Sequence, residues 1–88
     1  AALPRPLTEF TFIDMGCGKG RTLLMADSYG FRRIMGVEFA KELVEAAHAN
    51  ITPLLVRYPG RVSVLHLDAA QYEFPDEPLV VYFYNPFG

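Results

Sequence analysis

The sequence has a single cysteine, no tryptophan and no long apolar run. One cysteine cannot build a disulfide framework, and no spacing of Cys and His is typical of a zinc site, so we predict no metal centre. We expect a reducing compartment, the cytoplasm. No apolar run approaches the roughly 20 residues of a membrane span, and no basic and apolar leader is seen. We therefore expect neither a signal peptide nor a membrane partner.

The chain also lacks an excess of charge of one sign. Eight Lys and Arg against ten Asp and Glu give a net charge of -2, and the only basic pair is Arg32 and Arg33. Nucleic acids bind clustered positive charge, so we do not expect this segment alone to bind them. With 88 residues, of which 51% are hydrophobic, the chain has the composition of at most one soluble globular domain.

Apolar stretches and turn residues alternate along the chain in the pattern of an α/β fold. An extended N-terminal arm is expected over residues 1–8. Pro53 and Pro59 are expected to break the connection over residues 51–60, in which a further helical turn is an open alternative. Apolar strands separated by amphipathic helices indicate a Rossmann-like, doubly wound parallel sheet covered on both faces, in the order βαβαββ. The predicted strands are 9–13, 33–38, 61–67 and 79–84, and the predicted helices are 20–29 and 40–50.

Polar residues follow each predicted strand. They are Asp14 with its glycines, Glu38, Asp68, and the Asn85-Pro86-Phe87 segment. Each of the three acids alone also fits a structural role, as part of a tight turn or as an acid at a helix start. In parallel sheets, however, ligands bind at the carboxyl ends of the strands. The joint placement therefore favours a single ligand site at this edge.

The glycine loop "DMGCGKG" favours a cationic ligand over a pyrophosphate. A dinucleotide fingerprint would need a third glycine where Arg21 stands, and a phosphate loop would need Ser or Thr where Gly20 follows Lys19. The Asp14 carboxylate would repel pyrophosphate and attract an ammonium or a sulfonium. We therefore expect the ligand to carry positive charge.

The segment from "FIDMGCGKG" to "YNPFG" resembles the front half of a class I S-adenosylmethionine-dependent methyltransferase. The family's D-x-G-x-G-x-G motif is matched by Asp14, Gly16, Gly18 and Gly20, and its acid after the second strand by Glu38 in "GVEFA". The "LDAA" and "YNPFG" segments are similar to the family motifs after strands three and four. By this resemblance, residues 9–88 are the N-terminal part of a cofactor-binding methyltransferase domain with about four of its seven strands. We accordingly expect a fragment of a longer enzyme.

The resemblance implies S-adenosyl-L-methionine as the cofactor. The glycine loop, with Met15 and Cys17, would hold the methionine part, and Asp14 would lie near its ammonium. Glu38 would accept hydrogen bonds from both ribose hydroxyls.

The resemblance also places the adenine and the acceptor. Phe39 would pack on the adenine, Asp68 would receive its amino group, and the Ala69 N–H would meet a ring nitrogen. The Asn85 carbonyl would lie near the cofactor ammonium, on the path to the acceptor. Asn85-Pro86-Phe87 is similar to the catalytic [ND]-P-P-[FYW] motif of methyltransferases that act on planar nitrogens, without its second proline. The acceptor is not identified, and an amine nitrogen is one candidate.

Two other functions stay open at this point. One is an NAD-binding Rossmann oxidoreductase domain, and the other is a non-catalytic, methyltransferase-like module for protein contacts. Methyl transfer from a sulfonium needs no dedicated nucleophile, and Cys17, His48 and His66 are predicted to be structural. The apolar strand over residues 79–84 would have an open edge, which favours pairing with another chain such as a second copy.

Overall fold

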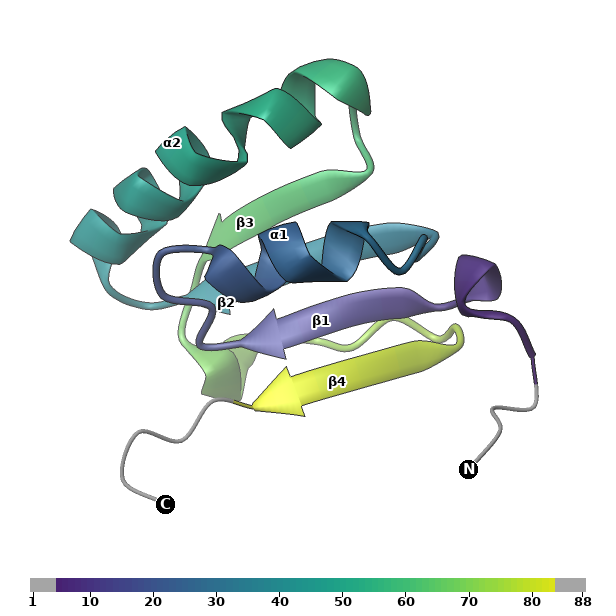
Figure 1. The fold of residues 1–88 in the computed structure, drawn as a ribbon. Coiled ribbons are helices and arrows are strands. Elements are labelled where there is room, and N and C mark those ends of the chain that lie inside the picture. Colours follow the sequence, from purple (N-terminus) through teal and green to yellow (C-terminus); the bar gives the residue numbers. More distant parts are fainter. Residues whose placement is uncertain (1–4, 84–88) are drawn as a thin grey trace.

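A computed structural model describes residues 5–83 and contains a four-stranded parallel sheet (Figure 1). The strand order is β3-β2-β1-β4. The strands are β1 (Thr11–Met15), β2 (Arg33–Glu38), β3 (Val62–His66) and β4 (Leu79–Phe83), and the helices are α1 (Arg21–Asp27) and α2 (Lys41–Arg57). Two short 3-10 turns are η1 (Leu7–Glu9) and η2 (Ala69–Gln71). The predicted Rossmann-like α/β class is confirmed.

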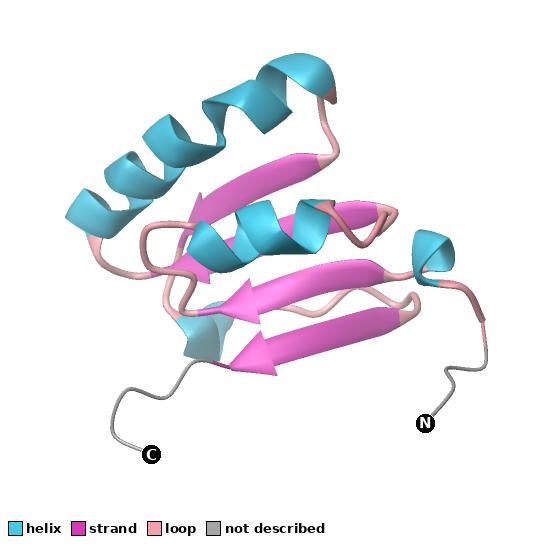
Figure 2. Cartoon of the chain, in the orientation of Figure 1, coloured by secondary structure: helices cyan, strands magenta, loops and turns pink. Residues whose placement is uncertain are grey.

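The two faces of the sheet are covered by different elements. Both helices lie in front of the sheet in Figure 2, while the connection from β3 to β4 passes behind it. The front core joins Leu23 of α1 and Ile51 of α2 to Ile34 of β2, all fully buried. Behind the sheet, Ile13, Met15 and Val37 pack with Tyr72 and other partly buried residues of the connection and the strands. Helices therefore cover one face of the described part, and a loop with η2 covers the other.

The first strand begins later than its sequence pattern predicted. Residues Leu7–Glu9 form η1, in which the Phe10 N–H donates to the Leu7 carbonyl at 2.9 Å. Leu7 also packs against the front core, so the expected extended arm does not run through residue 8. The strand also ends later than predicted, at Met15, so Asp14 lies inside β1 and not after it.

The second helix runs through Pro53, so the predicted break at this proline is wrong. The spacing of Ala47, Ile51 and Leu54 keeps one apolar face buried against the core. Fully burying a leucine or isoleucine gains about 1.5 to 3 kcal/mol each, which offsets the roughly 3 kcal/mol cost of an interior proline. The Thr52 hydroxyl also donates to the His48 carbonyl at 2.8 Å. No helix in the described part is long and apolar enough to span a bilayer.

Strand β4 is an edge of the sheet within residues 5–83. It pairs with β1, from Thr11 opposite Leu79 to Met15 opposite Phe83. Its last three residues are exposed, with Phe83 at 68%. The expected exposed apolar strand is thus present, while pairing of this edge with another chain stays a prediction.

Candidate functional site

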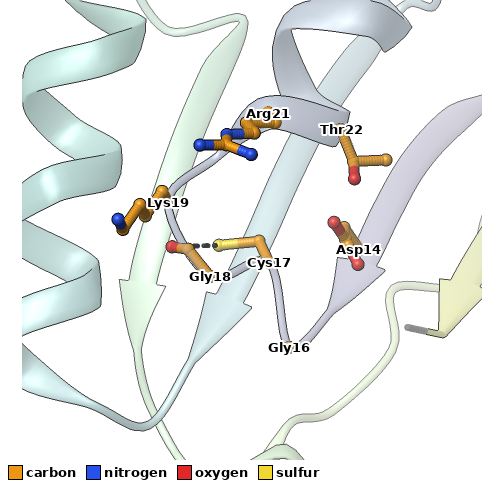
Figure 3. A pocket seen from close by; sticks show the side chains of 7 residues that line it. All are labelled: Asp14, Gly16, Cys17, Gly18, Lys19, Arg21 and Thr22. Atoms are coloured by element: carbon orange, nitrogen blue, oxygen red, sulfur yellow. Dashed lines mark hydrogen bonds between the residues drawn. The ribbon is translucent and has the colours of Figure 1, made fainter. Parts of the chain in front are cut away.

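A pocket of about 390 Å³ opens at the carboxyl end of β1 (Figure 3). It lies between β1 and α1, next to the point where the connections leaving β1 and β3 run to opposite sides of the sheet. Ligands of open α/β sheets bind at such a reversal of strand order. The pocket is lined by Asp14, Gly16, Cys17, Gly18, Lys19, Arg21 and Thr22.

Two glycines of the loop have a backbone conformation that residues with a side chain rarely adopt. Gly16 and Gly18 have φ values of 87° and 56°, in the left-handed region. Among residues 5–83, a Cβ added at either position would meet no atom within 4 Å beyond its own chain neighbours. The space beside these two residues is therefore open to a ligand.

Gly20 has a different role in the same loop. Its φ is also positive, but an added Cβ would lie 3.3 Å from the Ala47 Cβ of α2. This glycine therefore permits close packing of the loop on α2 and faces away from the open space.

Glu38 ties the loop to the start of α2. Its Oε1 accepts the Gly18 N–H at 2.8 Å, and its Oε2 accepts the Ala40 N–H at 3.0 Å. Each carboxylate oxygen can accept a second hydrogen bond, and the side chain is only half-buried. The structure thus brings Glu38 beside the glycine loop, as the sequence predicted, with acceptor capacity to spare.

Asp14 is a buried carboxylate with an unused oxygen. It is 1% exposed, and its Oδ1 has no hydrogen-bond partner in the described structure. Burial raises the pKa of Asp14 to about 6, the Thr22 side chain opposes this rise, and the charge of Glu38 adds to it. A buried oxygen without a donor is costly, and a cationic donor entering the pocket would relieve that cost.

Cys17 lines the pocket but is not a reactive thiol. Burial, with smaller contributions from the charges of Asp14 and Glu38, raises the pKa of Cys17 to about 12. The thiol is therefore protonated near neutral pH.

Gly36 in the middle of β2 makes room for Cys17, and sequence reasoning missed it. A Cβ at Gly36 would lie 2.6 Å from the Cys17 Sγ and 2.9 Å from the Leu23 Cδ1. A glycine inside an apolar strand is the signal that could have identified it, because such a glycine often marks a close approach of another chain segment. Lys19, Arg21 and Thr22 were also not among the predicted site residues.

Other predicted residues lie around the pocket or away from it. The side chain of Met15 packs behind the sheet with Ile13 and Val37, and Met15 does not line the pocket. Phe39 is 69% exposed beside Glu38.

The end of β3 is held next to Glu38. The Leu67 N–H donates to the Glu38 carbonyl at 3.0 Å, which places the following turn beside it. Asp68 and Ala69 are exposed there, and the Asp68 Oδ1 accepts the Ala70 N–H at 2.9 Å at the start of η2. Their adenine contacts stay predictions, and Asn85, Pro86 and Phe87 lie outside the described residues.

Comparison with known proteins gives one family. A family model described as "Methyltransferase domain" matches residues 12–87. No curated protein sequence matches the chain significantly.

Solved structures of similar proteins were also found. An RNA methyltransferase from Salinibacter ruber in complex with S-adenosyl-L-homocysteine is 26% identical with a TM-score of 0.71, over 85% of this chain and 47% of that one. The YcgJ protein from Bacillus subtilis is 30% identical with a TM-score of 0.64, over 78% and 28% of the two chains. The 23S rRNA methyltransferase ErmE, at 20% identity, shares the fold, with a TM-score of 0.74 over 96% and 31%. The chain thus spans less than half the length of each of these structures.

Proposed function

Because this chain belongs to the methyltransferase domain family of class I S-adenosylmethionine-dependent proteins, we propose that it binds S-adenosylmethionine at the glycine loop and serves methyl transfer. The observation that carries the proposal is the pocket itself. It combines the buried Asp14 Oδ1, which has no hydrogen-bond partner in the described structure, with the free space beside the backbone of Gly16 and Gly18.

The pocket residues fit the methionine part of this cofactor. The Asp14 Oδ1 can accept a hydrogen bond from the ammonium group, which supplies the donor that the oxygen lacks. Lys19 and Arg21 line the same pocket and offer positive charge to the carboxylate of that amino-acid part. Gly16 and Gly18 leave room for close approach along the loop.

The ribose and adenine are assigned to the neighbouring turns. Glu38 would accept hydrogen bonds from the ribose hydroxyls with the free lone pairs of its carboxylate. Phe39 would pack on the adenine, while Asp68 and the Ala69 N–H would meet its polar edge. These residues lie on the β2–α2 turn and the turn after β3, which the bond from the Leu67 N–H to the Glu38 carbonyl holds together.

Methyl transfer from this cofactor requires the protein mainly to align the methyl group with its acceptor. When bound, the cofactor supplies a methyl group on a sulfonium that is already activated for displacement. The residues of the site then have to orient the reactants and keep water away. A protonated Cys17 agrees with this division of work, because no covalent nucleophile is required.

Binding of S-adenosylhomocysteine is expected to weaken as the pH falls from about 7 to about 5. The pKa of Asp14 is about 6 in the free protein, and an ammonium partner would lower it in the complex. Affinity should therefore be full above the free-protein pKa and decrease below it, by up to about tenfold per pH unit. Calorimetric titrations across this range measure the effect.

The control for this pH dependence is Asp14→Asn. This variant should bind more weakly near pH 7 and show a flatter pH profile, because it cannot ionise at this position. A wild-type affinity that is the same at both ends of the range would contradict the role given to Asp14.

We further propose an amine nitrogen as the methyl acceptor. The proposal is supported by the Asn85-Pro86-Phe87 sequence that follows β4 and is similar to the motif of methyltransferases acting on planar nitrogens. RNA is a second candidate for the molecule that carries the acceptor, because one similar solved structure is an RNA methyltransferase at 26% identity.

The test supplies the full-length protein with methyl-labelled S-adenosylmethionine and separate pools of lysine-containing peptides, small amines and RNA. Label recovered as an N-methyl product supports the proposed acceptor atom, and the labelled pool identifies its carrier. An O-methyl or C-methyl product would contradict the amine proposal. No transfer in any pool, despite cofactor binding, would favour the non-catalytic interaction module.

A further inference from the structure

The turn between β2 and α2 is held from two sides. On one side, the Glu38 carboxylate accepts the Ala40 N–H across the turn and the Gly18 N–H from the glycine loop. On the other side, the end of β3 contributes two contacts. The Leu67 N–H donates to the Glu38 carbonyl at 3.0 Å, and the His66 Nε2 lies 2.8 Å from the Phe39 carbonyl oxygen.

His66 is placed for this contact by the sheet register. It is the last residue of β3 and lies directly opposite Glu38, the last residue of β2. A carbonyl oxygen only accepts, so the contact requires the proton on Nε2. Phe39 itself lies between β2 and α2, and its side chain is 69% exposed, so packing does little to anchor it.

We propose that His66 is a positioning residue of the cofactor site. Its Nε2–H fixes the Phe39 carbonyl and thereby the turn that presents Glu38 to the ribose and the Phe39 ring to the adenine. This role rests on the proposed function, because it concerns the same cofactor. It gives a specific task to a histidine whose sequence context indicated only a structural one.

His48 provides a matched control within the same fold. Its Nε2 lies 3.3 Å from the Val64 carbonyl, so it too joins a histidine to a backbone oxygen. That contact links α2 to the middle of β3, away from the β2–α2 turn. Replacing either histidine would lower stability in general. Only replacement of His66 should disturb the geometry of the β2–α2 turn.

The experiment compares S-adenosylhomocysteine binding by the full-length wild type and three variants, with thermal unfolding followed in parallel. We expect His66→Ala to weaken binding by about fivefold or more, as loss of one hydrogen bond implies. His66→Gln can donate from its amide and should bind within about twofold of the wild type, as should His48→Ala.

A second measurement on the wild type needs no variant and no cofactor. Long-range ¹H–¹⁵N NMR spectra of the imidazole report which ring nitrogen carries the proton. We expect protonation at Nε2 of His66, and a neutral ring protonated at Nδ1 would overturn the proposal.

The binding outcomes separate this proposal from the proposed function. If His66→Ala binds as tightly as the wild type, or if His66→Gln binds as weakly as His66→Ala, the proposed role of His66 is overturned. Cofactor binding by the wild type is then unaffected. Absence of binding by the folded wild type would overturn both. If His66→Ala does not fold, the protonation state of the ring and the affinity of His66→Gln decide the matter.

Discussion

Replacing Glu38 with alanine is expected to weaken binding of S-adenosylhomocysteine by about 10-fold to 150-fold. The proposed hydrogen bonds from the ribose to this carboxylate are charge-assisted, and such bonds are worth about 1.5 to 3 kcal/mol. The variant also releases the Gly18 N–H, which the Glu38 Oε1 accepts at 2.8 Å, so the glycine loop loses a support. Titration calorimetry on folded protein measures the change.

Three comparisons separate the ribose contact from the support of the loop. Glu38→Gln keeps the shape of the side chain but only one acceptor oxygen, so its affinity should be intermediate. The 2′-deoxy analogue of S-adenosylhomocysteine should bind the wild type more weakly than the parent ligand, while Glu38→Ala should scarcely distinguish the two. Glu45→Ala removes an exposed carboxylate of α2 and serves as the matched control. An affinity of Glu38→Ala within about twofold of the wild type would contradict the assignment.

Replacing Gly36 with alanine is expected to lower the free energy of unfolding by about 1 to 3 kcal/mol, the usual cost of overpacking a core. The new Cβ would lie 2.6 Å from the Cys17 Sγ and 2.9 Å from the Leu23 Cδ1, both in the buried front core. Either neighbour has to move, and Cys17 belongs to the glycine loop. Cofactor affinity should therefore fall together with stability, and denaturant unfolding and calorimetry measure the two effects.

A double-mutant cycle with Cys17→Ala provides the control for Gly36. Removing the sulfur takes away the nearest atom, so Gly36→Ala should cost less in the Cys17→Ala background than in the wild type. The rescue should be partial, because the Cys17 Cβ would remain 3.0 Å from the added atom and the Leu23 contact would persist. An equal cost in both backgrounds would show that the sulfur does not limit the space at Gly36.

The parts of the fold with strong local signals could be predicted from the sequence. The bounds of β2, residues 33–38, agree between the apolar pattern and the structure, and the Gly-rich loop does meet Glu38 at one edge of the sheet. Local signals failed where tertiary packing decides. The α2 helix continues past Pro53 because this buries Leu54 in the core. Leu7 packs on the core, so the arm is not extended there.

The rest of the site depends on contacts between residues far apart in the chain. The His66 ring reaches the Phe39 carbonyl across 27 positions, and Gly36 accommodates a cysteine from another element. The glycine inside an apolar strand indicates a close approach at Gly36, but no spacing in the sequence identifies Cys17 as the neighbour or pairs His66 with Phe39. The unpartnered oxygen of Asp14 is likewise a property of burial, which the residue type alone does not reveal.

The most direct test of cofactor binding at the glycine loop is a calorimetric titration of the folded full-length protein with S-adenosylhomocysteine and, separately, with NAD. We expect S-adenosylhomocysteine to bind at least about tenfold more tightly than NAD, because only S-adenosylhomocysteine has an ammonium group that can donate to the unpartnered Asp14 Oδ1. Tighter binding of NAD, or no binding of S-adenosylhomocysteine by well-folded protein, would contradict a methyltransferase cofactor site at this loop.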